Sequence, residues 1–142
     1  TGCFPADTPV LMANGSKKRF ADIRPGDQVM TYDIGYDRQV ARRVLEVYQV
    51  EGNHLYWING ELLTTGGERL LTENGWQTIR NLKVGDQVHI GGKMVEIKRI
   101  SLTRQDVTLH NMQVADTHNF YVSTSVEGAF LVHNTGGGGG GK

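Results

Sequence analysis

The sequence contains one cysteine, Cys3, and three prolines among 142 residues. A single cysteine cannot form an intrachain disulfide or supply a cysteine-rich zinc site. So little proline excludes a collagen-like or proline-rich disordered chain. No run of about 18 apolar residues occurs, so the sequence holds no candidate membrane-spanning helix.

The sequence also lacks an excess of either charge. Lysine and arginine together number 15, and aspartate and glutamate together also number 15. Such a chain has no overall basic field to attract a nucleic-acid backbone or an acidic membrane. We therefore expect neither nucleic acid nor a membrane as a partner, and no residue spacing indicates a metal or another cofactor.

Strand patterns dominate the residues that are present. Apolar and polar residues alternate with period two in segments 44–50, 95–100 and 107–114. Segment 55–58 is aromatic and β-branched, and segments 119–123 and 129–133 are two more short strand-like runs. This alternation indicates half-buried strands, and no segment shows a helical period. Asn-Gly pairs begin at positions 14, 59 and 74, where they predict type I′ hairpin turns. The chain has the length of one domain, and its expected fold class is all-β.

Two parts of the chain resemble each other. The tetrapeptide Gly-Asp-Gln-Val occurs at residues 26–29 and again at 85–88, and each copy follows an Asn-Gly pair at a similar distance. Gly-Asp is a common turn before a strand, so chance is the simpler explanation of the tetrapeptide alone. The matching turns favour a duplication, and two copies are too few for a solenoid. We expect two related β-units with an approximate twofold axis.

Reactive residues lie near both ends of the chain. The Cys3 thiolate can attack the preceding carbonyl, that of Gly2, through a five-membered ring and convert the amide into a thioester. The Asn134 side-chain amide can attack its own carbonyl, which forms a succinimide and cuts the bond to Thr135. His133 is placed to protonate the leaving nitrogen or to polarise that carbonyl. The Thr135 hydroxyl is a candidate acyl acceptor.

Three motifs together resemble the Hint domain, the fold shared by inteins and hedgehog autoprocessing domains. They are the opening Cys-Phe-Pro-Ala-Asp-Thr at residues 3–8, Asp-Thr-His-Asn-Phe at 116–120, and His-Asn at 133–134. The chain is most similar to bacterial intein-like domains that end in His-Asn. The resemblance implies a horseshoe-like, self-processing domain at residues 3–134. Residues 1–2 and 135–142 would be its flanks, the latter a glycine-rich disordered tail.

The resemblance also implies a role for each matching residue. Cys3 would perform an N-to-S acyl shift, and Asn134 would cyclise with assistance from His133. His118 would activate the second cleavage by proton transfer. Asp116, in the same motif, would position a proton or the thiol. Thr65 would match the threonine of a Thr-x-x-His motif that supports the N-terminal scissile peptide.

Position 68 departs from this family pattern. The sequence reads Thr65-Gly66-Gly67-Glu68, so a glutamate occupies the place of the histidine expected to protonate the departing amine of Cys3. A free glutamate is ionised at neutral pH, and it becomes an acid there only if burial or a nearby carboxylate raises its pKa. We expect the N-terminal step to be slow, or to use Glu68 in an altered way.

The implied activity is a single-turnover, autocatalytic cleavage of both flanks, with splicing through Thr135 as a further outcome. The domain would be a monomer whose partners are its own flanking polypeptides. The sequence does not identify the cellular compartment, and one expectation is that the domain belongs to a bacterial secreted or surface precursor. Two alternatives remain: a hydrolase with a Cys3–His118 pair, and a β-rich binding module with partly decayed chemistry. Turnover of an added substrate beyond one equivalent would favour the hydrolase.

The substitution Glu68→His tests the departure at position 68. If the glutamate slows the N-terminal step, this variant should release its N-terminal flank faster than the parent in the presence of a thiol, as measured by intact mass. An unchanged rate would count against a slow step caused by Glu68.

Overall fold

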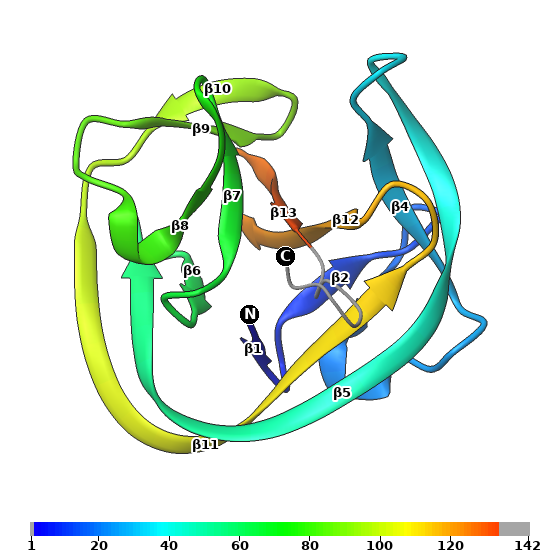
Figure 1. The fold of residues 1–142 in the computed structure, drawn as a ribbon, viewed down its shortest axis with the longest axis horizontal. Helices are drawn as coiled ribbons and strands as arrows, with labels where there is room; N and C mark the ends of the chain where they lie inside the picture. The colour runs from blue at the N-terminus through cyan, green and yellow to red at the C-terminus, as the bar shows by residue number, and fades with distance from the viewer. Residues whose placement is uncertain (1, 134–142) are drawn as a thin grey trace.

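The computed structural model describes residues 2–133, which form two antiparallel β-sheets (Figure 1). The first sheet has the order β1 (Phe4–Pro5), β11 (Ile100–Val114), β5 (Arg38–Ile58), β4 (Gln28–Asp33), and β6 (Leu62–Thr64) also pairs with β5. The second has the order β10 (Lys93–Glu96), β9 (Gln87–Ile90), β7 (Arg69–Thr72), β13 (Gly128–His133), β12 (Asn119–Ser125), β2 (Pro9–Leu11), β3 (Lys17–Arg19), and β8 (Gly75–Thr78) pairs with β7. The only helical segments within residues 2–133 are two 3₁₀ turns, η1 (Phe20–Asp22) and η2 (Ile79–Asn81). The all-β prediction is confirmed.

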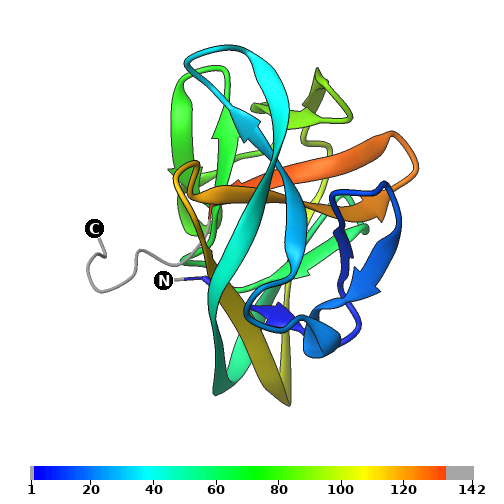
Figure 2. The ribbon, with the colours of Figure 1, turned by 90° about the vertical axis from the view of Figure 1, so that its right-hand side faces the viewer.

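Two long strands give the molecule its horseshoe outline. β11 pairs along its length with residues 44–58 of β5, and the two strands curve around the lower edge of the view in Figure 1. Irregularities in this pairing, between Arg104 and Val107 and between Gln113 and Val114, accompany the curvature. In the side view of Figure 2, β12 and β13 run across the direction of the long strands. No helix in the described range is long and apolar enough to cross a membrane.

The expected strand boundaries were wrong in two places. Segments 44–50 and 55–58 belong to one strand, β5, because the pairing with β11 continues through Glu51 and Gly52. Segment 95–100 is not one strand, since β10 ends at Glu96. The next residue, Ile97, is fully buried and donates its N–H to the carbonyl of Asp86 at 2.8 Å.

The turn prediction was right at only one of the three Asn-Gly pairs. Asn59 and Gly60 both have positive φ, 55° and 68°, as a type I′ turn requires. At the other two pairs only the glycine has positive φ, 88° at Gly15 and 92° at Gly75. A type I turn followed by a left-handed glycine fits those two hairpins.

The two duplicated units share equivalent backbone hydrogen bonds. Gly26 donates to the carbonyl of Val44 at 2.8 Å, and Gly85 donates to that of Ile97 at 2.8 Å. The turn η1 begins with a bond from Phe20 N–H to the Thr8 carbonyl, and η2 begins with a bond from Ile79 N–H to the Glu68 carbonyl, both at 2.8 Å. Thr8 in the first unit therefore corresponds to Glu68 in the second.

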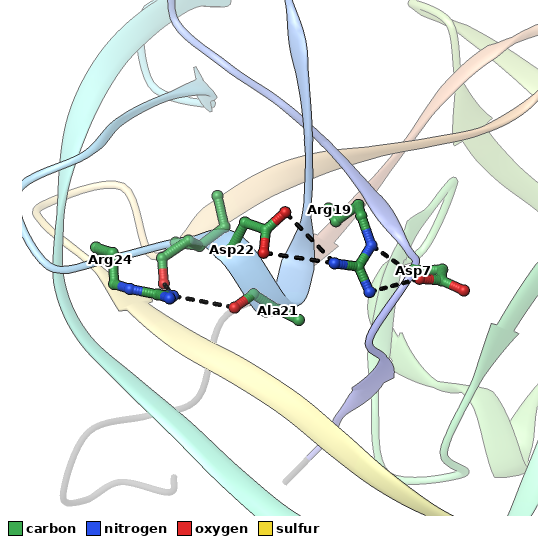
Figure 3. Close-up of polar contacts among 6 residues, drawn as sticks. Asp7, Arg19, Ala21, Asp22 and Arg24 are labelled. Carbon is green, nitrogen blue, oxygen red and sulfur yellow. Dashed lines mark hydrogen bonds and ion pairs between the residues drawn. The ribbon is translucent and has the colours of Figure 1, made fainter.

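Figure 3 shows how exposed charges surround η1. Arg19 donates through Nε to Asp7 at 2.8 Å and makes a longer ion pair with Asp22 at 3.4 Å. Arg24 donates to the carbonyl of Ala21 at 3.0 Å. Exposed ion pairs of this kind are screened by solvent and contribute little, so the fold depends mainly on its core.

An aromatic cluster in the core fixes the start of the chain. The ring of Phe4 stacks on Phe20 with centroids 5.4 Å apart, and the ring of Phe120 lies edge-on to both. Phe4 and Phe120 are fully buried, and Phe20 is 2% exposed. Because Phe4 follows Cys3 directly, this cluster holds the cysteine at a fixed place between the two sheets.

Removal of one ring tests the importance of this cluster. Phe20→Ala should lower the free energy of unfolding by about 3–5 kcal/mol, because it leaves a cavity among aromatic side chains. Chemical denaturation measures the change, and Tyr36→Ala is the control because Tyr36 is 76% exposed. Equal losses for the two variants would show that the cluster does not hold the fold.

Candidate functional site

The backbone on both sides of Cys3 is held by a pair of threonines at the end of β6, Thr64 and Thr65. The Cys3 N–H donates to Oγ1 of Thr65 at 2.9 Å. The Cys3 carbonyl accepts from Oγ1 of Thr64 at 2.7 Å and from the N–H of Thr65 at 3.2 Å. Thr65 is therefore placed on the nitrogen of the Gly2–Cys3 peptide, the position that the family resemblance implies for it.

The carbonyl of Gly2 has a partner that the sequence did not identify. Nδ2 of Asn111, on β11, donates to this carbonyl oxygen. The orientation of the Asn111 amide is fixed by its Oδ1, which accepts from Met112 N–H at 2.7 Å. Oxygen of this carbonyl would carry negative charge during attack by a thiolate, so Asn111 occupies the place of an oxyanion donor.

A faint signal for Asn111 exists in the sequence. Apolar residues occupy odd positions at Val107 and Leu109 but even positions at Met112 and Val114. Asn111 lies where this alternation changes, and the structure buries it to 1% exposure. A buried amide at such a point is a candidate for a functional or structural hydrogen bond.

The thiol of Cys3 is buried and held in its neutral form. Burial, followed by the nearby Glu68 carboxyl, raises the pKa of Cys3 to about 11. With that pKa, on the order of one thiol in 10⁴ is ionised at pH 7, and the thiolate is the reactive species. An open pocket of about 390 Å³ lies beside it; its lining includes Cys3, Thr65, Gly66, Gly67, Tyr56 and Arg80.

Glu68 is a buried carboxyl that lies against Gly2 at the start of the chain. Its side chain is 1% exposed, and Oε2 accepts the backbone N–H of His133 at 3.1 Å. Oε1 is buried without a hydrogen-bond partner among the described residues. Burial raises the pKa of Glu68 to about 8, against the backbone hydrogen bonds from Arg69 and His133, which lower it. At neutral pH most of this carboxyl is therefore a neutral acid.

The last strand brings His133 to the same place. Its backbone reaches Glu68, and its ring lies edge-on to Trp76 with centroids 5.0 Å apart and planes at 88°. Asn134, Thr135 and the expected glycine-rich tail at 135–142 lie outside the described residues. The two ends of the domain are thus connected through Glu68. β1 and β13 both lie near the centre of the view in Figure 1.

Asp116 and His118 occupy the turn between β11 and β12, and the residue that follows them, Asn119, pairs with His133 on β13. Both are exposed, and both have left-handed backbone, with φ of 62° and 58°. Asp116 forms an ion pair with Arg42 at 3.4 Å. Within residues 2–133, no hydrogen bond or ion pair joins either of them to Cys3 or Glu68. The turn therefore lies next to the end of β13 and makes no described bond to the residues around Cys3.

No group of three or more His, Cys, Asp or Glu residues able to hold a metal ion occurs in the part of the chain that the structure describes.

A family model agrees with this geometry. The model of the pretoxin Hint domain matches residues 10–135, and the chain belongs to this family. None of the curated proteins compared with the chain matches it.

Solved structures extend the similarity to almost the whole chain. A bacterial intein-like domain from Clostridium thermocellum is 26% identical, with a TM-score of 0.82 over 93% of this chain and 98% of that one. A DnaB intein from Synechocystis sp. PCC 6803 shares the fold at 15% identity, with a TM-score of 0.77 over 94% of this chain and 99% of that one. The TvoVMA intein is 20% identical and has a TM-score of 0.76 over 94% of this chain and 98% of that one. The fold is that of Hint domains and inteins, and the chain is a self-processing domain that acts within its own precursor polypeptide.

The substitution Asn111→Asp tests the oxyanion donor. The aspartate keeps an oxygen acceptor for Met112 but replaces the donor to the Gly2 carbonyl with a second oxygen. Release of the N-terminal flank should fall by about 10²–10³-fold, as for other lost oxyanion donors. Intact mass over time measures it, and Asn53→Asp on the exposed part of β5 is the control. A loss of less than twofold would remove Asn111 from the reaction.

Proposed function

We propose that residues 3–134 form a domain that cleaves both of its flanks, by an acyl shift at Cys3 and by cyclisation of Asn134. The observation that carries the proposal is the arrangement around one peptide bond. The Gly2–Cys3 peptide has Asn111 on its carbonyl, Thr65 on its nitrogen, and the buried acid Glu68 beside it. A binding module has no need for a peptide bond held in this way.

The first reaction is an isomerisation of the Gly2–Cys3 amide. Sγ of Cys3 attacks the carbonyl carbon of Gly2, a carbon–sulfur bond forms, and the carbon–nitrogen bond breaks. The proton that the thiol loses balances the proton that the departing amine gains. Asn111 stabilises the oxyanion, and neutral Glu68 supplies the proton to the amine. Glu68 thus replaces the expected histidine as the acid, and a scarce thiolate makes the step slow at neutral pH.

The second reaction takes place at the end of β13. The Asn134 amide attacks its own carbonyl, the bond to Thr135 breaks, and His133 protonates the leaving amine. Thr135 is the acceptor of the thioester if the two flanks are joined. Glu68 and Trp76 support this end of the chain through the backbone and the ring of His133. His118 and Asp116 assist from the turn before β12, whose first residue, Asn119, pairs with His133.

The domain acts as a monomer on its own flanks, without nucleic acid, membrane or cofactor. The alternative hydrolase requires a pair between Cys3 and His118. The described residues give this pair no hydrogen bond, whereas Glu68 lies near enough to Cys3 to raise the pKa of its thiol.

Product masses over time test the two reactions separately. The parent should lose both flanks, Cys3→Ala only the C-terminal one, and Asn134→Ala only the N-terminal one, faster with added thiol. A ligated product should appear only when both residues are intact. Retention of both flanks by the parent, or cleavage in the double variant Cys3→Ala/Asn134→Ala, would contradict the proposal.

The pH dependence of the N-terminal step gives a sharper prediction. The reactive form of the protein has a thiolate at Cys3 and a protonated Glu68. Below pH 8 both groups are protonated in most molecules, so the reactive form has one proton fewer than the prevailing form. The rate should therefore rise about tenfold per pH unit up to about pH 8, then stay level until about pH 11. It is measured in Asn134→Ala with the trapping nucleophile at saturation.

Glu68→Gln is the matched control for this profile. The amide cannot donate a proton as a carboxylic acid does, so the rate should be lower and the break near pH 8 should disappear. Persistence of that break in Glu68→Gln would assign it to another group.

A further inference from the structure

Gly2 lies directly against the backbone of Glu68. A Cβ atom placed on Gly2 would lie 2.3 Å from the Glu68 Cα and 2.2 Å from its Oε1. Contacts of a Cβ below 3.0 Å are essentially absent from real structures. A rotation of the Glu68 side chain would move Oε1 away, but it would leave the Cα in place.

The peptide around Gly2 cannot easily withdraw from this contact. Asn111 holds its carbonyl, and Thr65 holds the next N–H at 2.9 Å. Thr64 holds the carbonyl of Cys3 at 2.7 Å. A retreat from Glu68 would break at least one of the bonds that place the scissile carbonyl.

The backbone of Glu68 is equally fixed. Its N–H donates to the carbonyl of Thr65 at 3.2 Å, and its carbonyl accepts from Ile79 at 2.8 Å. These bonds belong to the duplicated turn before η2, and the residue is 1% exposed. Both sides of the contact are therefore held by the same structure that forms the site.

We propose that this site accepts only glycine immediately before Cys3, so that the substrates of the domain are N-terminal flanks that end in glycine. The backbone of Glu68 is the selecting element. This inference rests on the proposed function, because the selected residue carries the carbonyl that the thiolate attacks. Any larger residue displaces that carbonyl from Asn111 and from the thiol.

Gly2→Ala in the Asn134→Ala background is the first test. The release of the N-terminal flank should fall about 10²-fold, the cost of moving a reacting atom by about 1 Å. Gly35→Ala is the matched control, because its added Cβ would meet only Oδ1 of Asp33, at an ordinary 3.5 Å. It should cleave at the parent rate. Equal rates for Gly2→Ala and the parent would overturn the proposal.

The C-terminal cleavage distinguishes a loss of specificity in Gly2→Ala from a general loss of folding. With Asn134 intact, Gly2→Ala should still lose its C-terminal flank at the parent rate. An equal loss of both cleavages in Gly2→Ala would overturn the proposal, since it would indicate general unfolding instead of selection.

Hydrogen exchange provides a readout that needs no cleavage. In Cys3→Ala/Asn134→Ala, the amide of residue 3 should be protected by its bond to Thr65, and the addition of Gly2→Ala should reduce this protection at least about tenfold. Unchanged protection would contradict the glycine subsite. Two results can also occur together: Gly2→Ala loses the protection at residue 3, and the parent protein never releases its N-terminal flank. That combination would support the glycine subsite and reject the proposed acyl shift.

Discussion

A buried carboxyl connects the two ends of this domain. Glu68 accepts the backbone N–H of His133, lies against Gly2, and has one oxygen without a partner among the described residues. An ionised carboxylate in such surroundings is costly, so the group remains protonated at neutral pH. The chemistry proposed for the first peptide bond depends on this residue, which also accepts a hydrogen bond from the end of the last strand.

Burial affects the acid and the nucleophile in the same direction. It raises the pKa of Glu68 to about 8 and the pKa of Cys3 to about 11. The acid is therefore available at neutral pH, while the thiolate is scarce. A fold that holds its peptide bond tightly thus also keeps the first reaction slow, and the thiolate becomes the limiting species.

Much of the fold could be predicted from the sequence because its signals are local. Strand-like runs in the sequence identified β5, β11, β12 and β13, and the recurring Gly-Asp-Gln-Val tetrapeptide identified the duplicated unit. The length of β5 and the end of β10 could not be predicted, because they depend on pairing with β11 and on the bond from Ile97 to Asp86. These are contacts between distant parts of the chain.

The functional site could also be predicted only in part. Family motifs identified Cys3, Thr65 and the unusual Glu68, which the structure brings together. Asn111 carries no motif, since its importance comes from the pairing of β11 with β1 at the start of the chain. Glu68 occupies the position in the second unit that Thr8 occupies in the first. This equivalence is seen in the backbone hydrogen bonds of the two units and not in the sequence.

Direct titration of Glu68 tests the central claim most closely. Carbon-13 NMR of the Glu68 carboxyl in Cys3→Ala/Asn134→Ala follows this group without cleavage. The titration of the Glu68 carboxyl should have its midpoint near pH 8. A midpoint near the ordinary value of 4.5 would show an ionised carboxylate at neutral pH and would contradict its role as the acid.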